Sequence, residues 1–145
     1  MDVSKLIWAL VIVAVIGGGW LFTSGGVNYM YKNATEATVG QDVERDKIDE
    51  ATLSKWGGFL LSTFQYEKAR KFYQTAVERY PTGANVWWNY YQLARAHEKL
   101  ENYRDAVNIL TQLRDQDADS HDERVPERDN LDLRIQKLKE VHDIK

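Results

Sequence analysis

The stretch YEKARKFYQTAVERYP, from Tyr66 to Pro81, decides the fold of this 145-residue chain. Ala69, Tyr73 and Ala76 are spaced by four and three residues, so they lie on one face of a helix. Small and large side chains that alternate on such a face let a second helix approach closely and interlock with it. The stretch therefore predicts a helix that packs tightly against a neighbour.

A second copy of this pattern follows after about 37 residues, as YRDAVNILTQLRDQDA. In this copy Ala106, Leu110 and Leu113 occupy the matching face. An amphipathic helix is expected ahead of each copy, over Thr52–Thr63 and Val86–Leu100. The repeating unit is then a helix–turn–helix, and we predict an all-α fold built from a short solenoid of such units.

The two copies resemble the tetratricopeptide repeat family. In that family a small residue in the first helix precedes an aromatic, an alanine, a second aromatic, a second alanine and a closing proline in the second helix. The first repeat, residues 49–82, matches at Gly57, Tyr66, Ala69, Tyr73, Ala76 and Pro81. The second repeat, residues 83–118, matches at Leu93, Ala94, Tyr103 and Ala106 and departs at Leu110, Leu113 and Ala118. The resemblance implies that the matching residues pack the repeats together and that the domain binds proteins.

The resemblance also implies that the first helix of each repeat lines a concave groove for a protein partner. The groove residues mapped onto this chain are Lys55, Trp88, Tyr91, Arg95 and Lys99, with Ser54 beside Lys55. Trp, Tyr and Arg dominate the energetics of protein interfaces, and an arginine among aromatics suits a carboxylate. In the alternative arrangement, Trp87, Tyr90 and Ala94 face the core while Trp88 and Tyr91 pack on a capping helix.

The C-terminal segment, residues 119–145, supplies an acidic loop and a third amphipathic helix. Its apolar residues are spaced by four and three, and they are Leu131, Ile135, Leu138 and Val141. A short array needs a cap because no single unit buries its own apolar face. We expect this helix to be the cap; alternatively it is a surface that binds another protein.

The stretch LIWALVIVAVIGGGWLF, from Leu6 to Phe22, has no charged side chain. As a helix it spans about 26 Å, or about 33 Å if it continues to Val27, which is enough to cross a bilayer. We expect a transmembrane anchor over residues 1–31, with residues 6–27 in lipid, and a polar tether over residues 32–48. A signal peptide is the alternative, because Lys5 gives a charged start. A smooth patch for a partner helix is expected at Gly18, Gly19, Gly25 and Gly26.

Composition and spacing argue against several other functions. The net charge of −3 is unusual for a nucleic-acid binder, and the chain has no cysteine for disulfides or thiolate metal sites. The acidic run Asp115–Glu123 lacks the glycine and the final acid of a calcium loop, so we expect a solvated loop. The histidines, which share no metal-binding spacing, are His97, His121 and His142. We expect no metal, cofactor, small-molecule substrate or catalytic residue.

Two functions of different classes fit these features. The first is a scaffold or accessory subunit of a larger membrane protein complex. The second is a membrane-tethered chaperone or assembly factor that holds extended client segments transiently. The short basic N-terminal tail favours a cytoplasmic N-terminus. The repeat domain would then lie outside the cytoplasm, which in a bacterium is the periplasm.

Overall fold

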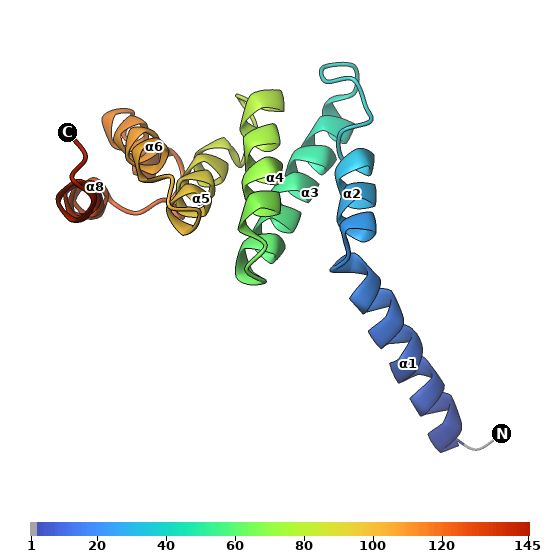
Figure 1. Cartoon of the computed structure of the whole chain (residues 1–145). Coiled ribbons are helices and arrows are strands. Elements are labelled where there is room, and N and C mark those ends of the chain that lie inside the picture. Colours follow the sequence, from blue (N-terminus) through green and yellow to red (C-terminus); the bar gives the residue numbers. More distant parts are fainter. Residues whose placement is uncertain (1–2) are drawn as a thin grey trace. The chain divides into compact units, whose positions relative to one another are not determined.

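The computed structural model describes residues 3–145, and within this range every regular element is a helix (Figure 1). This confirms the predicted all-α class. The chain divides into two compact units, of which the first ends at Glu36 and the second comprises Ala37–Lys145. Each unit is described by itself.

The first unit contains α1 (Val3–Leu21) and α2 (Ser24–Asn33). The 19 residues of α1 form a helix long and apolar enough either to span a membrane or to be a signal sequence, and none of them is buried. At about 28 Å its length is close to the roughly 30 Å hydrocarbon core of a bilayer.

The expected continuation of this helix to Val27 is wrong, because the helix stops at Leu21. The hydroxyl of Thr23 donates to the carbonyl of Trp20 at 2.6 Å and accepts the N–H of Gly26 at 3.3 Å. Threonine in this position starts a new helix by pairing a backbone donor that the first turn leaves free. The polar TSGG segment is therefore the junction of two helices.

The four glycines predicted as a smooth patch differ in their surroundings. A Cβ at Gly18 or Gly19 would meet no atom within 4 Å, whereas one at Gly26 would collide with the carbonyl of Trp20. Gly26 is thus required where the first turn of α2 passes the end of α1. At Gly25 a Cβ would make ordinary contacts with the Thr23 hydroxyl, at 3.7 Å, and with Nε1 of Trp20, at 3.9 Å. Packing of these glycines against a partner helix stays a prediction.

The second unit consists of helices that pack one after another in chain order. They are α3 (Val43–Ser62), α4 (Tyr66–Arg79), α5 (Val86–Lys99), α6 (Tyr103–Asp115), the short α7 (Ala118–His121) and α8 (Arg128–His142). α3 packs on α4, α4 on α5, α5 on α6, and α8 lies against α6 (Figure 1). This order is consistent with a short helix–turn–helix solenoid of the tetratricopeptide type.

The first helix of the solenoid is longer than the periodicity predicted. α3 begins at Val43 and not at Thr52, inside the segment expected to be a tether. The carboxylate of Asp42 accepts the backbone N–H groups of Glu44 and Arg45 at 3.0 and 3.1 Å. This N-cap, with acidic residues in the first turn, stabilises the start of the helix.

The core between α3 and α4 forms around Tyr73, which is 1% exposed. Its ring lies directly over Gly57, where a Cβ would come within 2.8 Å of two ring carbons. The alanines of the repeat pattern are also buried, namely Ala69, Ala76, Ala94 and Ala106. Tyr66 and Tyr103 are half-buried, and Pro81 is exposed just after α4. Small residues and one large ring therefore set the spacing of the first pair of helices.

The C-terminal helix contributes to a second core. Leu131 and Ile135 of α8 are buried together with Leu110 and Leu113 of α6. Leu138 is partly buried against this cluster, whereas Val141 is 66% exposed. The amphipathic face of α8 thus covers α6 with its first three predicted apolar positions and leaves the last one in solvent.

We expect the stability of the second unit to depend on pH through His97 of α5. This residue is 8% exposed, and its Nδ1 lies 3.8 Å from the Asp105 carboxylate. Burial lowers the pKa of His97 below its ordinary value of 6.5, with Arg70 acting in the same direction and Asp105 and Glu67 opposing. As the pH falls below 6.5 the unfolded chain binds this proton first, so the folded state loses stability.

We therefore expect the urea midpoint of the protein to fall between pH 7.5 and pH 5.5. In His97→Phe, which keeps an aromatic ring at this position, the decrease should be smaller. An equal decrease in wild type and His97→Phe would assign the pH dependence to other groups.

Candidate partner-binding groove

A concave surface lies between α3 and α5, and we name it the α3–α5 groove. Its volume is about 330 Å³. The residues that line it are Ala51, Ser54, Lys55 and Gly58 of α3, Tyr73 of α4, Asn85, Trp88 and Gln92 at α5, and Arg124. Two of the predicted groove residues, Lys55 and Trp88, are among them, with Ser54 beside Lys55 as expected.

Arg124 comes from the loop between α7 and α8, and periodicity gave no indication of its position. Its guanidinium carbon lies 5.5 Å from the centre of the Trp88 ring, within the range of a cation–π contact. The same guanidinium donates to the carboxylate of Asp122 at 2.7 Å and to the side-chain oxygen of Asn85 at 3.1 Å. A loop residue thus forms one wall of the groove.

Asp122 fixes this loop to the start of α5. Hydrogen bonds from Arg124 lower the pKa of its carboxyl group, against the opposing effect of burial. The backbone of Trp88 also favours the charged form of this carboxyl group. A negative side chain at the N-terminus of a helix pairs free backbone donors and interacts favourably with the helix dipole. The Asp122 side chain is 8% exposed, so the prediction of a solvated loop is wrong at this residue.

The neighbouring tryptophan is covered by the same segment. The rings of Trp87 and His121 are stacked, with centres 5.3 Å apart and an angle of 12° between their planes. His121 belongs to α7, the short helix within the acidic run. Both tryptophans of α5 therefore contact side chains that come from this C-terminal segment.

Tyr91 lies on the side of α5 that faces the capping helix, as in the alternative arrangement. Its hydroxyl accepts a hydrogen bond from Nη1 of Arg134 at 2.8 Å, and the guanidinium lies 5.6 Å from the ring centre. Arg134 also binds both carboxylate oxygens of Glu98, at 2.8 and 2.9 Å. This bidentate pair joins α5 to α8, and it gives Tyr91 a structural contact.

Arg95 and Lys99 do not line the groove. Nη1 of Arg95 donates to the side-chain oxygen of Gln92 at 2.9 Å, so Arg95 contacts a residue that lines the groove but does not line it itself. Burial raises the pKa of Tyr73 well above its usual range, and the positive charge of Arg95 opposes that shift. Lys99 is exposed at the C-terminal end of α5. Of the five predicted residues, Lys55 and Trp88 therefore line the groove, and Tyr91, Arg95 and Lys99 lie outside it.

The groove has a defined chemical character. Its lining residues include the cations Lys55 and Arg124 and the ring of Trp88, but no carboxylate. Lys55 is exposed, whereas Arg124 is held in place by Asp122. A cationic, partly aromatic surface of this kind suits a segment that bears a carboxylate.

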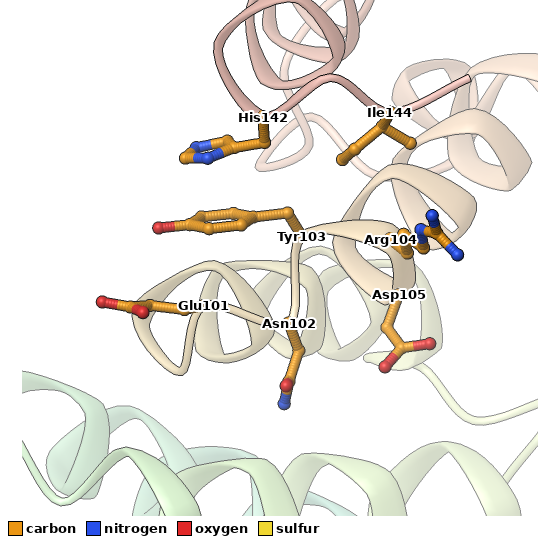
Figure 2. A pocket seen from close by; sticks show the side chains of 7 residues that line it. All are labelled: Glu101, Asn102, Tyr103, Arg104, Asp105, His142 and Ile144. Atoms are coloured by element: carbon orange, nitrogen blue, oxygen red, sulfur yellow. The ribbon is translucent and has the colours of Figure 1, made fainter.

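Another hollow lies where the C-terminal end of the chain meets the start of α6 (Figure 2). The rings of Tyr103 and His142 lie face to face there, with centres 3.4 Å apart. Ile144 lines the same hollow, and its N–H donates to the carbonyl of Lys139. This stacking attaches the end of α8 to α6. Across residues 3–145, no group of three or more His, Asp or Glu side chains could hold a metal ion.

Comparison with protein families agrees with this geometry. Residues 49–118 match the tetratricopeptide repeat family model, and the match spans most of α3 and all of α4, α5 and α6. The match supports the repeats expected from Gly57, Tyr73 and their neighbours. Proteins with such repeats are generally non-enzymatic scaffolds for protein–protein interaction. Comparisons with curated proteins and with solved structures gave no significant match.

Proposed function

We propose that this chain is a membrane-anchored scaffold that binds a protein partner in the α3–α5 groove, as an accessory subunit of a larger membrane complex. The observation that supports this most is the composition of the groove, which joins Lys55, Arg124 and Trp88 on one concave surface. The match of residues 49–118 to a family of interaction repeats supports the same class of function.

The chemistry of the groove indicates the kind of segment that it binds. Trp88 presents a large, rigid aromatic surface, which is typical of residues that dominate binding energy. Arg124 lies on this ring and is held there by Asp122, so little conformational entropy is lost when a partner binds. Lys55 adds an exposed positive charge on the opposite wall. We infer that the partner contributes an acidic side chain or a C-terminal carboxylate.

The anchor is α1. A helix of 19 residues with this composition and no buried residue avoids water either in lipid or against a partner helix. The short N-terminal tail with Lys5 favours a cytoplasmic N-terminus and a repeat domain outside the cytoplasm.

Co-purification of the full-length protein in mild detergent tests this function. We expect one or a few proteins at fixed stoichiometry, and at least tenfold less of them with Lys55→Glu or Trp88→Ala, since each removes a contact of the groove. Lys99→Glu reverses a charge outside the groove and is the matched control. Circular dichroism should show that all variants keep their helicity.

Two results would contradict the proposal. Many proteins at low stoichiometry would favour the chaperone or assembly factor. Unchanged co-purification with both groove variants would mean that the partner binds elsewhere on the chain.

A further inference from the structure

The turn between α3 and α4 ends in an exposed aromatic residue with an unfavourable backbone conformation. Phe64 is 78% exposed and has a φ of 62°, in the left-handed region. The N–H of Gln65 donates to the carbonyl of Leu60 at 2.9 Å, and the N–H of Phe64 to that of Leu61 at 3.4 Å. This is the helix-ending motif in which glycine is the usual residue, because it has no Cβ to clash. A phenylalanine there is costly both in backbone strain and in exposed apolar surface.

Further aromatic residues lie near this turn. Phe64 and Tyr66 form an edge-to-face aromatic pair, with ring centres 6.2 Å apart. Trp56 and Phe59 form a second such pair, with ring centres 5.4 Å apart. Trp56, Phe59 and Tyr66 are only half-buried. On α3, Trp56 and Phe59 follow Ile48, 60% exposed, at helical spacing, and Thr52 and Lys55 lie on the same face, so this face carries partly exposed apolar side chains beside a basic one. The ends of a soluble solenoid are normally polar.

The charge of this region is opposite to that of the whole chain. Between Ala51 and Tyr73 there is one acidic residue, Glu67, against four basic residues, which are Lys55, Lys68, Arg70 and Lys71. The whole chain has a net charge of −3. Glu67 pairs with Arg70 at 3.0 Å, so Lys55, Lys68 and Lys71 account for the net positive charge of this segment.

We propose that the α3–α4 turn docks on the surface of an anionic lipid bilayer through Phe64, Tyr66 and Trp56. Tyr and Trp, which combine an apolar ring with a polar group, favour the interface between lipid and water, the exposed ring of Phe64 adds apolar surface that lipid can bury, and nearby basic residues are attracted to anionic headgroups. The inference rests on the proposed membrane anchor. With α1 as the anchor, the connection to the repeat domain is limited to α2, about 15 Å long, and residues 34–42, which can extend by about 30 Å at most.

The chain has no cysteine, so single labels can be introduced cleanly. We would place a spin label at Ser62→Cys, which is exposed and leaves Phe64 intact. The full chain is reconstituted in vesicles of phosphatidylcholine alone or with one-third phosphatidylglycerol. In the anionic vesicles we expect the label to be more accessible to oxygen, and less accessible to a water-soluble nickel reagent, than in vesicles of phosphatidylcholine alone. A label at Gln136→Cys, exposed on α8, should remain equally accessible to nickel in both.

Phe64→Asn separates docking from folding. Asparagine adopts the left-handed conformation more readily than phenylalanine, so this variant should keep or raise the melting temperature. It removes the exposed ring, so in anionic vesicles the Ser62 label should be as accessible to the nickel reagent as the Gln136 label. Lys68→Glu with Lys71→Glu should have the same effect on the label in anionic vesicles.

A third label, at Val13→Cys in α1, distinguishes failure of this inference from failure of the anchor. If the Val13 label contacts lipid but the Ser62 label is exposed to water in anionic vesicles, the docking proposal is overturned and the anchor stands. If the Val13 label is in water, the anchor fails and the docking proposal with it. A Ser62 label shielded from both reagents would mean a protein contact, such as a second copy of the chain, and would overturn the assignment to lipid.

Discussion

Replacing Gly57 by alanine should lower the free energy of unfolding by about 1–3 kcal/mol, as expected for overpacking of a core. Alanine is the better helix former by roughly 1 kcal/mol, so a loss has to come from packing. The added Cβ would lie 2.8 Å from Cε2 and Cζ of Tyr73, closer than such atoms are found. Tyr73 is almost fully buried, so its ring has little room to move away.

Tyr73→Ala gives the complementary test of this contact. Alone it should cost about 3–5 kcal/mol, as is typical when a buried aromatic becomes alanine. Combined with Gly57→Ala it should cost less than the sum, because the Cβ at position 57 then meets no ring. Chemical denaturation followed by helical circular dichroism measures all three variants.

Gly58→Ala is the matched control for this cycle. Its Cβ would lie 3.3 Å from the Tyr73 hydroxyl alone, so we expect a small change in stability. Strictly additive effects of Gly57→Ala and Tyr73→Ala would contradict the packing of Tyr73 over Gly57.

This contact also shows which parts of the fold can be predicted from sequence. The spacing of Ala69, Tyr73 and Ala76 reports one helix face directly, because side chains three and four residues apart lie together. The repeat of that pattern then predicts a neighbour of the same kind. The all-helical class and the order of the packed helices followed from local spacing alone.

Helix ends were predicted less well, and the reason lies in single capping residues. The hydropathy of residues 6–27 is nearly continuous, yet Thr23 starts a new helix through its hydroxyl. Asp42 likewise starts α3 before its apolar periodicity becomes clear. Both residues are favoured N-caps, so this preference could have indicated both boundaries.

The position of Arg124 in the groove could not be predicted from helical spacing or from capping preferences. Arg124 contacts Trp88 and Asn85, which are far away in sequence, and its position depends on the path of a loop. No periodicity constrains a loop, and a run of acids is usually solvated. The prediction of the groove therefore located Lys55 and Trp88 but assigned Tyr91 to the same surface, although Tyr91 faces Arg134.

Replacing Glu50 by alanine should destabilise the second unit by about 2–3 kcal/mol, because a buried backbone donor loses its charged acceptor. Glu50 is 2% exposed on α3, and its Oε1 accepts the N–H of Asn85 at 2.8 Å. Asn85 precedes α5 and also accepts a hydrogen bond from Arg124. Glu50 therefore links α3 of the first repeat to the start of α5. Gly83 lies directly against its carboxylate, where any Cβ would collide.

Two further variants identify what this carboxylate does. Glu50→Gln keeps an oxygen that can accept from Asn85 and should retain most of the stability, whereas Gly83→Ala should displace the carboxylate and resemble Glu50→Ala. Urea denaturation gives the three free energies. If Glu50→Gln is as unstable as Glu50→Ala, the negative charge near Arg124 holds the loop, and the hydrogen bond to Asn85 does not. If neither Glu50→Ala nor Glu50→Gln loses stability, the start of α5 is held by the bond from Arg124 to Asn85, and the groove depends on the C-terminal loop and not on the first repeat.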